Sequence, residues 1–373
     1  MAAFLKLLRD NHNYRNMWMG QVVSEVGDHF NNIAVFSLAL ETTRSGLVVS
    51  GVMLARAIPA VLAGPVAGVL LDRLDRQRVM IASDLIRAVV ALAFILTVGW
   101  HGAGLLYLLS GLLMFASPFF TSGRSAILPN ITTREQLHTA NSLTQTTGWV
   151  TLTIGTFSAG ASIASFGFKA AFVINALSFL FSALCISRLH LPQGFVPKKK
   201  QSLTEADVVR PWHEYAEGLR YMRATPLILG IALLGVGWAS GGGAAQILFS
   251  LFGELVFNRG AAGIAIIWGC AGVGLIAGGV LGNWLGRRLT FNGYKRAVTL
   301  CYIVHGASYV VFSQMQRFSL ALLFIALSRA AVAVTSVLNF SQLLRHVTDD
   351  YRGRVFATME SMVWSTMMLS MMG

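Results

Sequence analysis

The sequence predicts an all-α polytopic membrane protein made of two pseudo-repeated six-helix bundles. Its composition, its long apolar runs and its uneven charge distribution support this fold class. The chain has 373 residues, of which 55% are hydrophobic and 12% charged, and its mean hydropathy is +0.62. A soluble chain carries roughly 25% charged residues, because its core needs a polar surface around it. The composition therefore excludes a soluble enzyme, a secreted module and a disordered chain.

Eleven stretches of the chain are long and apolar enough to be membrane spans. A helix needs about 20 predominantly apolar residues to cross the hydrocarbon core of a bilayer. The expected spans cover residues 16–40, 47–71, 79–99, 103–121, 139–166, 168–188, 226–251, 261–285, 296–315, 318–344 and 355–373. Because two repeated six-helix bundles need twelve spans, we expect a truncated chain that lacks the twelfth. The alternative is a native protein of eleven helices with an external C-terminus.

The distribution of lysine and arginine orients these spans. If the N-terminus is cytosolic, 22 of the 29 basic residues lie on the cytosolic side and 4 lie in external loops. The other three, Arg56, Arg87 and Arg329, lie within spans. Basic residues favour the cytosolic loops of membrane proteins. The formal charge of +13 therefore indicates a cytosolic rim and not a nucleic-acid partner.

The longest polar stretch follows the sixth span and divides the chain. It predicts an N-terminal six-helix bundle over 1–188, a cytosolic central loop over 189–225 and a C-terminal bundle over 226–373 with five spans. The second spans of the two halves both carry glycines at four-residue spacing, which lets helix backbones approach closely. These glycines are Gly64 and Gly68 in the first half and Gly274, Gly278 and Gly282 in the second. Parallel six-helix halves joined by a long loop are a layout of secondary transporters.

The loop after the second span carries the most specific motif. Residues 68–78 read GVLLDRLDRQR, which matches the pattern G-x-x-x-D-R-x-x-R-x-R. Further matching runs are 13–18, 140–143, 175–179 and 352–355. On these residues the chain resembles the major facilitator superfamily over essentially its whole length. Within that family it resembles the drug:proton exporter branch, which includes macrolide and enterobactin exporters.

Two positions depart from the exporter pattern. Thr156 stands where the branch often has the proline of Gly-Pro-x-x-Gly-Gly. Many proton-coupled exporters carry an arginine midway along the fourth span, but Leu105–Phe120 contains none and Arg124 lies only at its cytosolic end. Both departures weaken the expectation of proton antiport more than the expectation of transport.

The resemblance implies a cytosolic gate at the motif, where its first acid bridges to groups of the other half. The gate residues would be Gly68, Asp72, Arg73, Asp75, Arg76 and Arg78. A positive-inside anchor is the alternative; it explains the arginines but not the two acids between them. Asp84 and Arg87 can pair at i and i+3 and brace this loop. Arg352 and Arg354 before the eleventh span are further candidates for gate support.

Ionisable residues within a span cost about 2.5–3.5 kcal/mol each on insertion scales, so each is a candidate functional residue. Span one places four polar residues on one helical stripe: Gln21, Glu25, Asp28 and Asn32. A carboxylate enclosed by apolar residues can load and release a proton near neutral pH. We therefore expect Asp28, supported by Glu25, to bind a proton or a cationic substrate. The alternative is a structural ion pair with Arg56.

Other polar residues of the spans are candidates for the lining of a substrate cavity: Asn141, Gln145, Gln246, Arg329 and Glu360. For Asn141 and Gln145 in span five, tight helix packing is the alternative. Arg329 and Glu360 are intramembrane charges that either pair with each other or contact the substrate.

The expected function is that of a secondary transporter exporting an amphiphilic small molecule of the drug, macrolide or siderophore type by proton antiport. Such a protein would mediate efflux and multidrug resistance in the inner (plasma) membrane of a bacterial cell. The alternative is a metabolite or siderophore permease or facilitator without proton antiport. The chain has no Walker A loop and its eight histidines are scattered, so we expect no enzyme, catalytic residue, cofactor or metal. We expect a monomer whose partners are the substrate, protons and the lipid bilayer.

Overall fold

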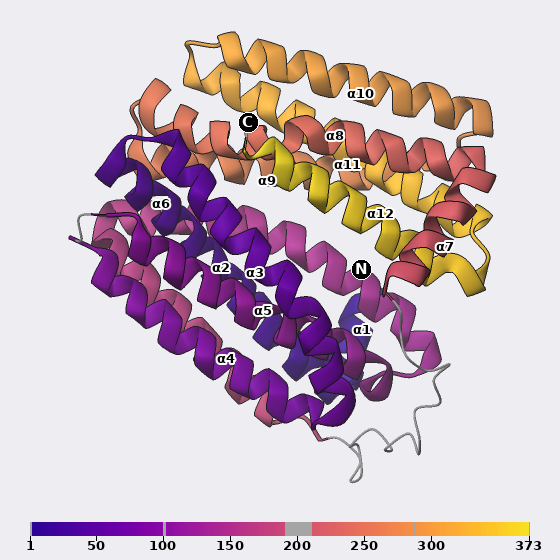
Figure 1. Cartoon of the computed structure of the whole chain (residues 1–373), viewed down its shortest axis with the longest axis horizontal. Coiled ribbons are helices and arrows are strands. Elements are labelled where there is room, and N and C mark those ends of the chain that lie inside the picture. Colours follow the sequence, from indigo (N-terminus) through magenta and orange to yellow (C-terminus); the bar gives the residue numbers. More distant parts are fainter. Residues whose placement is uncertain (1, 100–101, 191–210, 287, 373) are drawn as a thin grey trace. The chain divides into compact units, whose positions relative to one another are not determined.

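The computed structural model describes residues 2–99, 102–190, 211–286 and 288–372, and these ranges are helical and contain no strand. The first helices are α1 (Ala2–Asp10), α2 (His12–Thr43), α3 (Gly46–Arg73), α4 (Arg76–Ala93), the 3-10 turn η1 (Phe94–Thr97), α5 (Gly104–Ile131) and α6 (Arg134–Ser187). They are followed by α7 (Pro211–Ala224), α8 (Pro226–Leu251), the π-helical turn η3 (Phe252–Val256), α9 (Gly260–Gly286), α10 (Phe291–Gln314), α11 (Phe318–His346) and α12 (Asp349–Ser370), as Figure 1 shows.

The helices coincide with the apolar stretches expected from the sequence. Eight of them in the described ranges are long and apolar enough to cross a membrane. Helix α6 holds two expected spans and is interrupted at Gly167, whose φ of 75° and ψ of 178° leave the helical region. Helices α2 and α12 are not among the eight, because charged and amide side chains are spread along them. The polytopic all-α fold is confirmed, and the number of eleven spans stays a prediction.

Side-chain caps fix where several helices begin. Asn11 and Asp75 each accept hydrogen bonds from backbone N–H groups in the first turns of α2 and α4. Thr133 and Gln136 form a reciprocal capping box at the start of α6. Such caps satisfy N–H groups that have no partner within the helix. At its other end α2 stops at Arg44, which has the left-handed φ of 50°.

The chain forms two compact units. The first is Met1–Lys199 together with Ser250–Gly269, and the second is Lys200–Phe249 together with Cys270–Gly373. The segment Ser250–Gly269 contains η3 and the start of α9, and it packs on helices of the first unit. Within it, Ala265 lies against Gly160 of α6. The expected bundles over 1–188 and 226–373 differ from the compact units by this segment, and the division into repeated halves stays a prediction.

Helix packing differs between the units at the repeated glycines. In the first unit α2 packs along α6 and α3 packs along α5, while α10 packs along α11 in the second. A Cβ at Gly274 or Gly278 of α9 would meet a backbone carbonyl of α11, so these two helices touch through their backbones. Around Gly64 and Gly68 of α3, no described atom lies within 4 Å of such a Cβ. The shared spacing therefore predicts close packing correctly for α9 and not for α3.

Candidate functional site

The polar stripe expected on the first span lies on α2, which packs along α6 and also contacts α3 and α5. Gln21 is 1% exposed, whereas Glu25, Asp28 and Asn32 are half-buried. Residues three or four positions apart share one face of a helix. These four side chains therefore leave α2 toward the same side.

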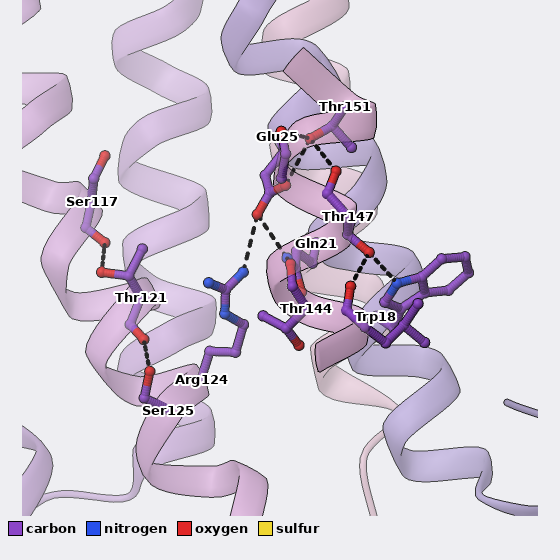
Figure 2. A network of polar contacts seen from close by, with 12 residues as sticks. Trp18, Gln21, Glu25, Ser117, Thr121, Arg124, Ser125, Thr144, Thr147 and Thr151 are labelled. Carbon is purple, nitrogen blue, oxygen red and sulfur yellow. Dashed lines mark hydrogen bonds and ion pairs between the residues drawn. The ribbon is translucent and has the colours of Figure 1, made fainter. Parts of the chain in front are cut away.

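Glu25 is held by partners from three helices, as Figure 2 shows. Its Oε1 accepts a hydrogen bond from Gln21 at 2.8 Å and lies 3.2 Å from Arg124 Nη1 of α5. Its Oε2 accepts a hydrogen bond from Thr151 Oγ1 of α6 at 2.9 Å. The side chains of Glu25 and Arg124 are 26% and 17% exposed. The charge of Glu25 is therefore balanced, and by an arginine that lies 99 positions away in the chain.

Threonines of α6 accept hydrogen bonds from the neighbouring residues on the same face of α2. Trp18 Nε1 donates to Thr147 Oγ1 at 2.8 Å, and Gln21 Nε2 donates to the carbonyl of Thr144 at 3.4 Å (Figure 2). The cavity candidates expected on the fifth span, Asn141 and Gln145, do not include these threonines. Their signal in the sequence is the helical spacing of Thr144, Thr147 and Thr151, which places them on one face.

Asp28 lies one turn further along α2 and has different surroundings. Its Oδ1 is buried and forms no hydrogen bond within the described residues. Arg56 of α3, the expected alternative partner, donates instead to Asn31 Oδ1 at 3.4 Å and to Asn32. The ion pairs among the described residues do not include Asp28 with Arg56. Asp28 and Arg56 therefore form no direct ion pair among the described residues, where the asparagines accept from the guanidinium, and the role of Asp28 stays a prediction.

The motif after α3 forms an anchored turn into α4. Asp75 caps α4 and pairs with Arg78 at 3.6 Å. Arg76 Nη1 donates to a backbone carbonyl of α5 at 2.9 Å. Arg73 is exposed, and the side chain of Asp72 lies outside the described part of the structure. The turn is thus tied to α5 by Arg76, while the first acid of the motif stays untested.

Asp84 and Arg87 form the ion pair that their spacing on α4 predicts, and their side chains are 0% and 3% exposed. The guanidinium lies between the rings of Phe120 of α5 and Phe179 of α6, at 4.7 and 4.3 Å from their centroids. An arginine over an aromatic face is attracted by the ring quadrupole. The pair therefore joins α4 to both neighbouring helices, which favours a bracing role over substrate contact.

The charged residues of the second unit have other surroundings. Arg354 of α12 pairs with Glu217 of α7, with 2.7 Å between Nη1 and Oε2. Arg329 of α11 is 8% exposed, and Glu360 of α12 is exposed. The two form no ion pair among the described residues. The described residues thus show no pairing between them, and contact of Arg329 and Glu360 with a substrate stays a prediction.

The structure describes few contacts for the remaining cavity and gate candidates. Gln246 Nε2 lies 3.3 Å from Met367 Sδ. The side chains of Asn141, Gln145 and Arg352 lie outside the described residues. In the described ranges no group of three or more His, Cys, Asp and Glu side chains is placed to hold a metal ion.

Long apolar helices with a polar network between α2, α5 and α6 define a polytopic membrane protein with a polar interior, the arrangement of proteins that move polar solutes through a bilayer. The chain belongs to the Major Facilitator Superfamily, whose family model matches residues 17–371. It is a multi-pass membrane transporter and not an enzyme.

Similar proteins cover almost the whole chain. BacE of Bacillus subtilis (strain 168), a proposed bacilysin exporter, is 25% identical over 361 residues, covering 96% of this chain and 86% of BacE. Macrolide efflux protein A of Streptococcus pyogenes is 24% identical over 367 residues, covering 96% and 86%. The solved nucleoside transporter NupG has a TM-score of 0.70 at 12% identity, covering 96% of this chain and 89% of NupG. The last likeness shows the fold alone.

Proposed function

We propose that this transporter exports an amphiphilic small molecule from a bacterial cell and is driven by proton antiport. The names of its relatives support export, since they describe a bacilysin exporter and a macrolide efflux protein. In such a mechanism two bundles alternate access to a central site. The charge distribution supports a cytosolic N-terminus, with 22 of the 29 basic residues on that side.

The observation that carries proton coupling is the contrast between two acids on one face of α2. Glu25 is bound by Arg124, Gln21 and Thr151. Asp28 has a buried Oδ1 without a hydrogen-bond partner among the described residues. Oδ1 of an ionised Asp28 would carry negative charge where no donor among the described residues meets it, and binding of a proton would relieve this cost. Asp28 is therefore the proposed site of proton binding.

The Glu25–Arg124 pair is the proposed link between protonation and helix packing. Leu105–Phe120 has no arginine midway along the span, but Arg124 of the same helix α5 reaches the α2 carboxylate. In this proposal the rearrangement of α2 that accompanies proton binding at Asp28 would release Arg124 from Glu25. The contact between α2 and α5 would then loosen, while the hydrogen bonds from α2 to the threonines of α6 would stay.

The turn between α3 and α4 is the proposed cytosolic gate. Arg76 ties the turn to α5, and Asp75 fixes the start of α4. A movement of the first-unit helices would therefore carry the motif, including Asp72, with it. Asp84 and Arg87 would keep α4 in place on α5 and α6 during that movement.

Accumulation of a dye tests export and coupling together. In a bacterial host that lacks its own exporters, expression of the full chain should lower the accumulation of ethidium or of a labelled macrolide. Asp28→Asn should abolish this effect, and Asp28→Glu should keep part of it. Asp10→Asn, an exposed acid at the end of α1, is the matched control and should change nothing. Unchanged export in Asp28→Asn would refute proton coupling through Asp28, and raised accumulation on expression would favour a permease.

A further inference from the structure

The second unit contains a buried arginine that the transport mechanism above does not use. Arg329 lies in the middle of α11 and is 8% exposed. Its Cζ is 5.0 Å from the ring centroid of Phe249 of α8 and 5.9 Å from that of Tyr309 of α10. Three helices of one unit therefore meet at this guanidinium.

Among the described residues no acidic side chain pairs with Arg329. The sequences of α8, α9, α10 and α11 contain no aspartate or glutamate. Within the described residues Arg329 forms no ion pair and donates no hydrogen bond. A charge that is buried without a partner is costly, so its presence in a span calls for an anion.

The aromatic rings around Arg329 satisfy only part of the guanidinium. A cation over a ring gains a contact through its flat face, whereas its five N–H groups point outward in the plane. Unpaired side-chain nitrogens that are fully enclosed occur in the described residues, but those of Arg329 are not among them. The guanidinium nitrogens are therefore not fully enclosed, which agrees with the 8% exposure of Arg329.

The aromatic side chains around Arg329 are held in place by contacts with one another. The rings of Phe249 and Tyr309 stack at 6.0 Å between centroids, and Phe312 meets Phe249 edge-on at 6.0 Å. His305 packs edge-on against Tyr309 at 4.7 Å, and its Nδ1 lies 2.7 Å from Ser328 Oγ. Phe249 and Phe312 are 0% and 3% exposed, so they form the buried support of this cluster, and the half-buried Tyr309 is the ring that can meet a ligand beside Arg329.

We infer that Arg329 binds a carboxylate or similar oxyanion of the transported molecule, while Tyr309 contacts its apolar part. The planar guanidinium matches a carboxylate through two parallel hydrogen bonds. The preferred substrates are therefore amphiphiles that carry an acidic group. This inference rests on the proposed function only in taking the bound molecule to be the transported substrate. The binding itself needs no proton gradient.

A matched pair of probes tests the inference. The purified full chain in lipid nanodiscs is titrated with N-dansyl-phenylalanine and with its methyl ester, and binding is followed by dansyl fluorescence. The acid should bind about 10- to 100-fold more tightly than the ester, which corresponds to a charged hydrogen-bonded pair. Arg329→Gln should remove this preference and leave the affinity for the ester unchanged. Arg329→Lys should keep a smaller preference, because it retains the charge without the fork.

Controls separate this site from structural effects and from proton coupling. Arg317→Gln changes an exposed arginine just before α11 and should keep the full preference for the acid. Asp28→Asn should also keep it, even where proton-coupled export is lost, so the two proposals fail independently. If Arg329→Gln does not give a monodisperse protein, the ratio between acid and ester in Arg329→Lys decides. Absent binding of the acid, equal affinities for acid and ester in the unmodified protein, or a full preference in either Arg329 variant would overturn the inference.

Discussion

The buried charged side chains of the two compact units differ in the partners that surround them. In the first unit Glu25 and Asp84 each have an arginine partner, and Asp28 is left with an unpaired buried oxygen among the described residues. In the second unit Arg329 lies among aromatic rings without an acid partner in the described ranges. Among the described residues, the first unit thus holds an acidic side chain, Asp28, without an ion-pair partner, and the second unit holds a cationic side chain, Arg329, without one. This difference suggests that proton binding belongs to the first unit and recognition of an anionic group to the second.

The largest effect is expected where a buried pair would be broken in the first unit. Asp84→Asn leaves the guanidinium of Arg87 enclosed without its counter-charge, and breaking such a pair costs about 3–5 kcal/mol. The thermal unfolding of the purified variant in detergent should show this loss. The double variant Asp84→Asn with Arg87→Met removes both charges and should be more stable than the single variant. A single variant as stable as the unmodified protein would refute the structural role of this pair.

The repeated glycines give the next effect, and the two units should respond with opposite signs. Gly278→Ala places a Cβ against a backbone carbonyl of α11 and should destabilise the protein by about 1–3 kcal/mol. Gly64→Ala meets no described atom within 4 Å and should stabilise α3 by up to about 1 kcal/mol, since alanine favours helix. Thermal unfolding of the two variants side by side measures the difference. Equal shifts would show that the two α-helices pack alike.

A smaller coupling is expected between Glu25 and Arg124. A double-mutant cycle with Glu25→Gln and Arg124→Gln should give an interaction free energy of roughly 0.5–3 kcal/mol, the range for residues in one ion-pair network. The same cycle with Glu25→Gln and Arg15→Gln, an arginine near the start of α2, should give none. A coupling of zero for Arg124 would mean that this contact does not hold α2 to α5.

The smallest effect is expected at the ion pair between α7 and α12. The side chains of Arg354 and Glu217 are 37% and 27% exposed, so water screens their attraction. Glu217→Gln should therefore cost at most about 1 kcal/mol in thermal unfolding, the usual range for exposed pairs. A loss as large as that of Asp84→Asn would show that α7 is a main support of the second unit.

The sequence predicts local features of this molecule better than contacts between distant helices. Hydropathy places the helices, and the spacing of Asp84 and Arg87 predicts their ion pair, because both depend on residues that are close in the chain. The contact of Arg124 with Glu25 depends on how α5 lies beside α2, which no local pattern contains. For the same reason the sequence left open an ion pair of Arg56 with Asp28, and it did not indicate that the neighbouring asparagines accept hydrogen bonds from Arg56.

The repeated glycines also show that a local pattern does not predict contacts between distant helices. Gly64 and Gly68 have the spacing of Gly274 and Gly278, so the sequence predicts equal packing for both pairs. Close approach also needs a neighbouring backbone at the right height, and only α9 has one within 4 Å among the described atoms. Four-residue spacing is therefore not sufficient for backbone contact, and the neighbouring helix decides whether the contact forms.

The most direct test of the central claim is the movement of protons that accompanies substrate transport. Proteoliposomes containing the full chain and the pH-sensitive dye pyranine are given a substrate identified by the accumulation assay, without an imposed pH gradient. The account predicts that protons move opposite to the substrate, and that Asp28→Asn abolishes this movement while Asp10→Asn preserves it. Substrate transport without any change in pyranine fluorescence, or an unaltered proton flux in Asp28→Asn, would contradict it.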